Sequence, residues 1–225
     1  MNAHDHPDSR GSSVRGVLEY QARTHAAADF VIAPETGRRL SFGDLLRSSR
    51  ALAAFLAAQG IAAGAHVGLL LPNGLQAVRL FVGVTACGRV LVPLSLIAQP
   101  AQLAFILGHS DCQAVFVAPE REEALRAALA SVRREVRMRL FIVDPDSALL
   151  PGESEQASWP DPEPAADAPA LLMYTSGCCR ATVAMRLRLL RVVCVSAARR
   201  RHRCRRLINA PLRSASPSAS SKPWV

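Results

Sequence analysis

The sequence predicts an α/β fold in which a parallel sheet is flanked by helices. Short apolar runs of strand length recur along the chain, and segments with apolar residues at helical spacing separate them. Glycine or proline stands at most of the junctions. This alternation is typical of βα units, whose strands are buried on both faces and are therefore almost continuously apolar. Length and apolar content fit a single main domain with a hydrophobic core.

The first predicted helix begins after Ser41 and ends before Gly60. Ser41 has the form of an N-cap, Asp44 follows three residues later, and leucines then recur at helical spacing, among them Leu45 and Leu52. Glycine is the residue that most often ends a helix.

The alternation then continues to residue 143. Apolar runs predict four buried strands, at residues 66–71, 90–94, 114–118 and 140–143. Helical spacing predicts helices between them, at residues 75–87, at 100–108 and from 119 onward. Pro119 and the glutamates after it mark the start of the last helix, because acids stabilise the positive end of the helix dipole.

A polar stretch with six prolines and seven acidic residues follows, at residues 144–169. This composition predicts an ordered loop or linker. Residues 170–174 are the last predicted strand and lead into Thr175, Ser176 and Gly177. Such a turn can present N–H groups and hydroxyls to phosphate oxygens, although ordinary turns also have this composition.

Charge divides the chain after Gly177. Residues 1–177 hold all 18 acidic residues and 15 of the 27 basic ones, a net charge of −3. Residues 178–225 hold the other 12 basic residues and no acid, a net charge of +12. We therefore divide the chain into a flexible N-terminus at 1–15, a domain at 16–177 and a basic, disordered tail at 178–225.

Three accounts of the tail are open. Its arginines are suited to nonspecific contact with nucleic acid or an anionic membrane surface. It could instead form a helix that packs on the domain. We favour a third account, translation after a change of reading frame, because the tail has no acidic residue and the whole chain has one lysine, Lys222.

Two cysteines of the domain, Cys87 and Cys112, lie in apolar periodic segments and are expected to be buried free thiols. Free thiols indicate a reducing compartment, and the N-terminus lacks the apolar run of a signal peptide, so we expect a cytoplasmic protein. Residues 51–71 and 80–98 approach membrane-spanning length. Polar residues, glycine or proline interrupt both, and we expect no membrane span.

No metal site is expected. The cysteines and the histidine of the tail lack the spacing of known zinc motifs; these residues are Cys178, Cys179, Cys194, His202 and Cys204. In the domain, His66 at the start of a strand and His109 at the end of a helix are expected to be surface histidines.

Five segments in order over residues 38–177 resemble the N-terminal part of the adenylate-forming enzymes, the superfamily of acyl-CoA synthetases and other acid-thiol ligases. The last, residues 171–177, matches the start of the family's phosphate loop, Y-T-S-G-T-T-G-x-P-K-G. The segments are Leu40-Ser41-Phe42-Gly43-Asp44-Leu45, Val67-Gly68-Leu69-Leu70-Leu71-Pro72-Asn73, Gly88-Arg89-Val90-Leu91-Val92-Pro93-Leu94, Gln102-Leu103-Ala104-Phe105-Ile106-Leu107 and Leu171-Leu172-Met173-Tyr174-Thr175-Ser176-Gly177. The resemblance implies an incomplete N-terminal subdomain of that fold over residues 16–177.

The resemblance implies ATP-dependent activation of a small-molecule carboxylic acid through an acyl-adenylate, with Mg²⁺ and coenzyme A as further requirements. It assigns the ATP phosphates to Thr175, Ser176 and Gly177. The family's two threonines, glycines and lysine are absent from the following residues, Cys178 to Ala184. The later family motifs are also absent. We therefore expect no catalytic residues, no bound cofactor and no adenylation by this chain, and the alternative is a binding protein that uses its arginine-rich tail.

Overall fold

The structure is a computed structural model that describes residues 13–34, 36–132, 138–147, 150 and 157–174, and the backbone of two strands at 181–186 and 191–196. The first two strands form a hairpin, β1 (Asp29–Ala33) and β2 (Arg38–Ser41). The others are β3 (His66–Leu70), β4 (Val90–Pro93), β5 (Cys112–Val117), β6 (Arg139–Ile142), β7 (Pro169–Tyr174), β8 (Ala181–Arg186) and β9 (Arg191–Ser196).

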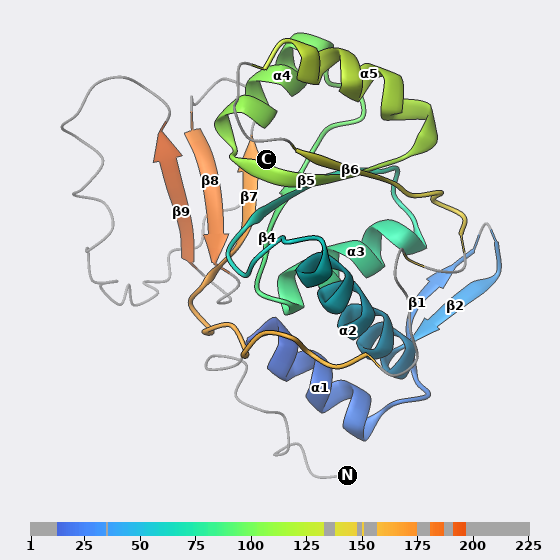
Figure 1. Cartoon of the computed structure of the whole chain (residues 1–225). Helices are drawn as coiled ribbons and strands as arrows, with labels where there is room; N and C mark the ends of the chain where they lie inside the picture. The colour runs from blue at the N-terminus through green and yellow to red at the C-terminus, as the bar shows by residue number, and fades with distance from the viewer. Residues whose placement is uncertain are drawn as a thin grey trace, which may run out of the picture.

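The main sheet has the strand order β6-β5-β3-β4-β7-β8-β9 (Figure 1). The five strands from β6 to β7 in this order are parallel to one another. The predicted parallel sheet with flanking helices is therefore confirmed, and each of its five strands lies within two residues of the predicted range at either end.

Helices cover both faces of the parallel part (Figure 1). The helices are α1 (Val14–Thr24), α2 (Phe42–Ala58), α3 (Leu75–Ala86), α4 (Pro100–His109) and α5 (Pro119–Ala130). Leucines of α2 and α3 pack on one face of the sheet together with Phe116. Leucines of α4 and α5 pack on the other face, around Val115 and Val117. The side chains of β5 thus alternate between two cores, as a buried strand requires.

Local signals in the sequence set the helix ends. Ser41 caps α2, and its side chain and that of Asp44 form the expected reciprocal capping box. Gly60 and Gly88, just after α2 and α3, both have a φ of 75°, which glycine adopts without steric cost.

The N-terminal region departs from the expectation of a flexible segment at 1–15. Residues 14 and 15 belong to α1, and Ser13 caps it by accepting a hydrogen bond from the Gly16 N–H. Leu18 is buried on α2 and α3 together with Leu40 and Leu45. A helix with an apolar face of this size is stabilised mainly by packing, which explains its order. Residues 1–12 lie outside the described part.

Two segments of the basic tail differ from the expected disorder. β8 pairs antiparallel with β7, and β9 pairs antiparallel with β8. The physical reason is the free edge of β7, whose N–H and C=O groups accept any extended segment as a neighbour. The other residues of 178–225 lie outside the described residues, and their disorder stays a prediction.

Candidate functional site

The carboxyl ends of the parallel strands lie along one edge of the sheet, where the chain leaves two neighbouring strands toward opposite faces. After β3 it enters α3 on one face, and after β4 it enters α4 on the other. In open α/β sheets such a point marks the crevice in which ligands bind. β7 is the other neighbour of β4, so the end of β7 at Tyr174 lies at this edge.

Tyr174 is held by an aromatic cluster on the α4 face. Its hydroxyl lies 2.7 Å from Nδ1 of His109, a hydrogen bond whose direction depends on the histidine tautomer. The His109 ring meets the Tyr174 ring edge-on, with centroids 5.8 Å apart. Phe105 stacks on the same histidine at 5.7 Å. The last described residue before the Thr-Ser-Gly segment is therefore fixed to the end of α4.

The pKa of the Tyr174 phenol is raised to about 12, first by burial and then by the nearby Cys112 and Asp111. At neutral pH this hydroxyl stays protonated. It serves as a neutral hydrogen-bonding group that orients the end of β7, and its chemistry does not suit a base or a nucleophile.

The candidate phosphate ligands Thr175, Ser176 and Gly177 lie outside the described residues. Of the two histidines expected at the surface, His109 is exposed at the end of α4, as expected. His66 is half-buried instead, with Nδ1 hydrogen-bonded to the carbonyl of Ser110. The contact of His109 with Tyr174 was not predicted, because 65 residues separate the two.

A fully buried arginine fixes the segment that leads into β7. Arg89 is 0% exposed and donates to the carbonyls of Ile61 and Cys87 at 2.7 to 3.2 Å. Its Nη1 also lies 2.5 Å from Oδ2 of Asp161, a partly exposed carboxylate. The charge is thus paired and hydrogen-bonded, which a buried ion requires. Sequence reasoning missed this role, although a single cation inside an apolar run was a visible signal.

A second arginine, Arg15 of α1, reaches the same segment. It donates to the carbonyls of Ala86 and Asp161 at 3.0 and 2.9 Å, and its guanidinium lies 4.2 Å from the ring centroid of Trp159. The indole N–H of Trp159 donates to Glu19 at 2.6 Å. Residues 157–168 are therefore attached to α1 through Arg15 and to the turn between α3 and β4 through Arg89.

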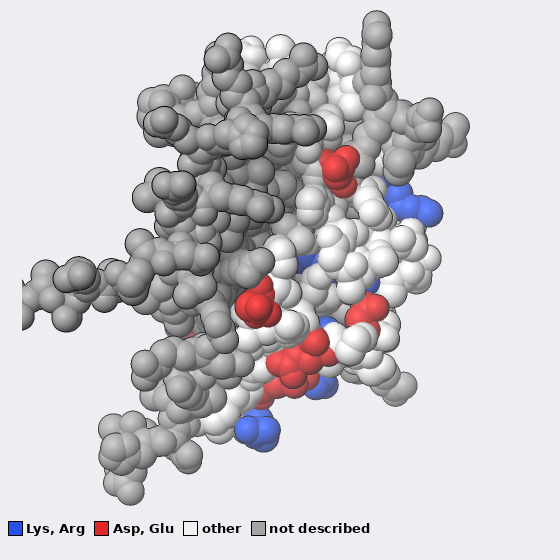
Figure 2. Space-filling view, turned by 90° about the vertical axis from the view of Figure 1, so that its left-hand side faces the viewer, with Lys and Arg blue, Asp and Glu red and all other residues white. Residues whose placement is uncertain are grey.

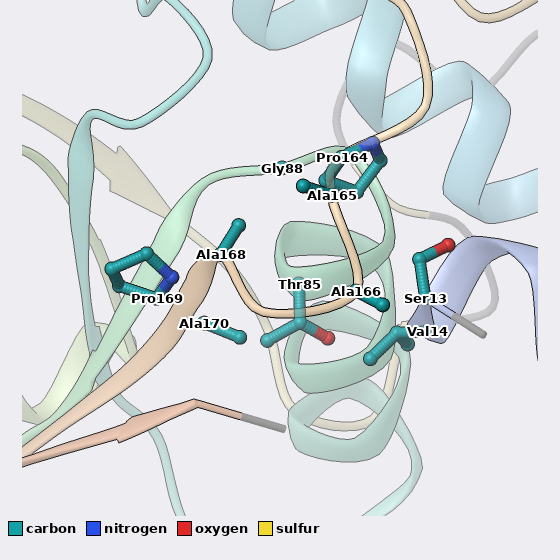
Figure 3. A pocket seen from close by; sticks show the side chains of 10 residues that line it. All are labelled: Ser13, Val14, Thr85, Gly88, Pro164, Ala165, Ala166, Ala168, Pro169 and Ala170. Atoms are coloured by element: carbon teal, nitrogen blue, oxygen red, sulfur yellow. The ribbon is translucent and has the colours of Figure 1, made fainter. Parts of the chain in front are cut away.

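A small cavity lies where this segment passes α3. Residues 164–170 pass over the end of α3 near Thr85 and Gly88, and Ser13 and Val14 line the other side (Figure 3). Its free volume of about 20 Å³ is room for one water molecule. Among the described residues that line it, the polar side chains are the hydroxyls of Ser13 and Thr85.

Figure 2 shows the side of the molecule on which β7 and residues 157–168 lie. On the described part of this side, most of the acidic side chains lie in the lower half, and basic side chains lie among and above them. Asp161, Glu163 and Asp167 are the acids of residues 157–168. The arginine side chains of 178–225 lie outside the described residues.

Within the described part of the chain, no group of three or more His, Cys, Asp or Glu residues could hold a metal ion. The tail residues considered as a zinc set, Cys178, Cys179, Cys194, His202 and Cys204, have no described side chains. None of the helices in the described ranges is long and apolar enough to cross a membrane. Cys87 and Cys112 are buried free thiols, as predicted.

Comparison with known proteins gives concordant results. A sulfoacetate–CoA ligase of Cupriavidus necator is 38% identical over 179 residues, covering 79% of this chain and 35% of the ligase. A long-chain-fatty-acid–CoA ligase of Mycobacterium tuberculosis, FadD13, is 27% identical over 161 residues, covering 72% of this chain and 32% of the ligase. The chain thus spans about a third of the length of these relatives.

Solved structures show the same fold. A fatty acyl CoA synthetase of Mycobacterium tuberculosis matches 77% of this chain with a TM-score of 0.67 and 24% identity, over 34% of its own length. A long-chain-fatty-acid-CoA ligase of Archaeoglobus fulgidus matches 78% with a TM-score of 0.66 and 20% identity, over 36% of its length. The family model described as AMP-binding enzyme matches residues 18–178. The chain therefore belongs to the AMP-binding, adenylate-forming ligase family and represents part of its N-terminal region.

Proposed function

We propose that this chain derives from the N-terminal part of an ATP-dependent acid–CoA ligase. Such an enzyme activates a carboxylic acid as its acyl-adenylate and then passes the acyl group to coenzyme A. The observation that carries the proposal is the position of Tyr174. It ends β7 at the ligand-binding edge of the sheet, directly before Thr175, Ser176 and Gly177.

In this proposal the three residues after Tyr174 begin the loop that holds the ATP phosphates. The hydroxyls of Thr175 and Ser176 donate to phosphate oxygens, and Gly177 lets the backbone approach them closely. The hydrogen bond between Tyr174 and His109 supports this role, because it fixes the strand end from which the loop departs.

The residues after Gly177 do not fit a complete site for Mg²⁺ and ATP. Cys178 to Ala184 supply neither the glycines that permit close backbone approach nor the lysine that neutralises phosphate charge. Each donor to a developing charge contributes orders of magnitude in rate. We therefore propose that this chain binds no cofactor tightly and does not catalyse adenylation by itself.

The substrate of the parent activity is proposed only as a class. One relative is a sulfoacetate–CoA ligase and another is a long-chain-fatty-acid–CoA ligase. Their acids share a carboxylate and differ in everything else, so we propose a carboxylic acid. The buried free thiols of Cys87 and Cys112 support a reducing compartment, and we propose the cytoplasm.

The proposal is tested by restoring the family's phosphate loop in this chain. In the repaired variant, the seven residues 178–184 are replaced by Thr-Thr-Gly-Ser-Pro-Lys-Gly, and in the matched control the lysine of that insert is alanine. We expect the repaired variant to bind pyrophosphate at least about tenfold more tightly than the native chain or the control, by isothermal titration calorimetry. The native chain should show no acid-dependent exchange of labelled pyrophosphate into ATP.

Two results would contradict the proposal. Equal pyrophosphate affinity in all three proteins would mean that the loop at the carboxyl end of β7 does not bind phosphate. Exchange above background by the native chain would show that residues 178–184 do not prevent adenylation.

A further inference from the structure

The segment of residues 157–168, hereafter the strap, crosses the domain beside α1 and leads into β7 (Figure 1). It forms no helix or strand, and each of its residues is half-buried or exposed. Trp159 is its one large apolar side chain. Pro160, Pro162 and Pro164 fix φ at three positions and supply no N–H. The strap is therefore stiff, and apolar burial contributes little to its attachment.

Polar contacts hold the strap, and Asp161 is at their centre. Its carbonyl accepts a hydrogen bond from Arg15 at 2.9 Å, and its carboxylate forms the ion pair with Arg89 at 2.5 Å. The side chain of Glu163 accepts a hydrogen bond from the hydroxyl of Ser13. Because the contacts with the two arginines meet at one residue, both are lost when Asp161 moves away from the domain.

Packing between the end of the strap and α3 is incomplete. The cavity of about 20 Å³ lies at this contact, between Pro164 and the alanines after it on one side and Thr85 and Gly88 on the other (Figure 3). Atoms that line such a space lack dispersion contacts on one side. The contact between strap and domain is therefore weaker than the packing of the apolar cores.

The end of α3 and the turn after it, beneath the strap, contain the thiol of Cys87. The two arginines that hold the strap also bind this turn: Arg15 donates to the carbonyl of Ala86 at 3.0 Å, and Arg89 donates to that of Cys87 at 2.7 Å. The Cys87 side chain is 1% exposed and packs in the same cluster as Trp159 of the strap. Burial raises the pKa of the thiol, so the covered thiol is protonated and a poor nucleophile.

We propose that the strap opens as one unit while the parallel sheet stays folded, and that this opening uncovers the thiol of Cys87. Segments with few buried apolar contacts are those that open at a free energy below that of global unfolding. The closed strap protects the thiol from reagents in solution, and the open strap admits them. The proposal concerns a motion of the chain and does not depend on the proposed function.

The experiment measures the rate at which N-ethylmaleimide alkylates Cys87 in the full chain at increasing urea concentrations. Mass spectrometry of tryptic peptides resolves Cys87 from the thiols of residues 178–225. Cys112 is the matched internal control, because it is also 1% exposed but lies in the core beneath α4 and α5. Asp161→Asn weakens the attachment of the strap. Asp167→Asn removes the same charge at an exposed position of the strap.

We expect Cys87 of the native chain to react at least about tenfold faster than Cys112 below the urea range of global unfolding. Its rate should also depend less steeply on urea, because opening the strap exposes less surface than unfolding the chain. Asp161→Asn should raise the Cys87 rate about a further tenfold, the factor expected for loss of a hydrogen bond between charged groups. Asp167→Asn should leave this rate unchanged.

Equal rates and equal urea dependence of the two thiols in the native chain would overturn the proposal, because Cys87 would then be uncovered only by global unfolding. This comparison needs no variant, so it decides even where Asp161→Asn fails to fold. In a folded Asp161→Asn variant, an unchanged Cys87 rate would also overturn the proposal, and so would equal acceleration of Cys87 and Cys112.

Discussion

Strands β5 and β7 enter the same parallel sheet by different physical means. β5 lies between helices, and its side chains are buried in two apolar cores, with Val115 and Phe116 both at 0% exposure. β7 follows a segment without helix or strand that two arginines, Arg15 and Arg89, attach to the domain. Apolar packing spreads the stabilisation of β5 over many contacts. β7 also places Leu171 in an apolar core, but the segment that leads into β7 is held by the charged contacts of two arginines and so depends on single residues.

Loss of the Arg89 charge should have the largest effect. We expect Arg89→Met to lower the free energy of unfolding by about 3–5 kcal/mol, because the carbonyls of Ile61 and Cys87 and the carboxylate of Asp161 lose their partner. Urea denaturation followed by circular dichroism measures the change.

The comparison of β5 with β7 also predicts which part of the chain loses stability when Arg89 is replaced by methionine. In Arg89→Met, hydrogen exchange should accelerate in residues 157–174 and stay unchanged in β5. Leu107→Ala is the matched control, because it opens the core between α4 and the sheet at a cost of about 2–5 kcal/mol. It should accelerate exchange in α4 and β5. The same exchange pattern in both variants would refute the distinction between the two strands.

Trp159→Phe should have a smaller effect. The change removes the hydrogen bond from the indole N–H to Glu19 and keeps an aromatic face beneath Arg15. We expect a loss of about 1–2 kcal/mol in unfolding free energy. Trp159→Leu also removes the aromatic face and should lose more. Equal losses in the two variants would mean that the cation–π contact contributes nothing.

The smallest expected effect is a loss of folding stability at alkaline pH, caused by the titration of Tyr174. In a Tyr20→Phe variant, Tyr174 is the remaining tyrosine, and its ultraviolet titration should have a midpoint of about 12. The unfolded chain should titrate near the usual value of about 10. Between these two values the folded state keeps a proton that the unfolded state has lost, so stability falls as pH rises from 10 to 12. A midpoint near 10 in the folded protein would contradict the burial of this phenol.

Much of the parallel sheet could be predicted from the sequence, because apolar runs and glycine stops are local signals. Gly60 and Gly88 end their helices as expected. α1 was missed although Val14, Leu18 and Ala22 have helical spacing, because three apolar residues in a polar region are a weak pattern. The β1–β2 hairpin was also missed, because its strands are short and mostly exposed.

The surroundings of the candidate site could be predicted only in part. The segment up to Tyr174 follows from pattern and resemblance. Its partner His109 and the anchor of Arg89 on Asp161 join residues 65 and 72 positions apart. The cavity beside the β1–β2 hairpin is likewise lined by residues of β2, α2 and α3. Such contacts depend on tertiary packing, for which single-sequence periodicity gives no signal.

The mixed pairing of β7 explains how this fold can accept a new sequence after a change in its gene. β7 is parallel to β4 on one side and antiparallel to β8 on the other. Ladder hydrogen bonds use only backbone groups, so they select for extended conformation and hardly for side-chain identity. A newly acquired downstream sequence can therefore extend the sheet without any history of selection for that place. The pairing of β8 with β7 is therefore no evidence of common descent, and residues before and after Gly177 can have separate evolutionary origins.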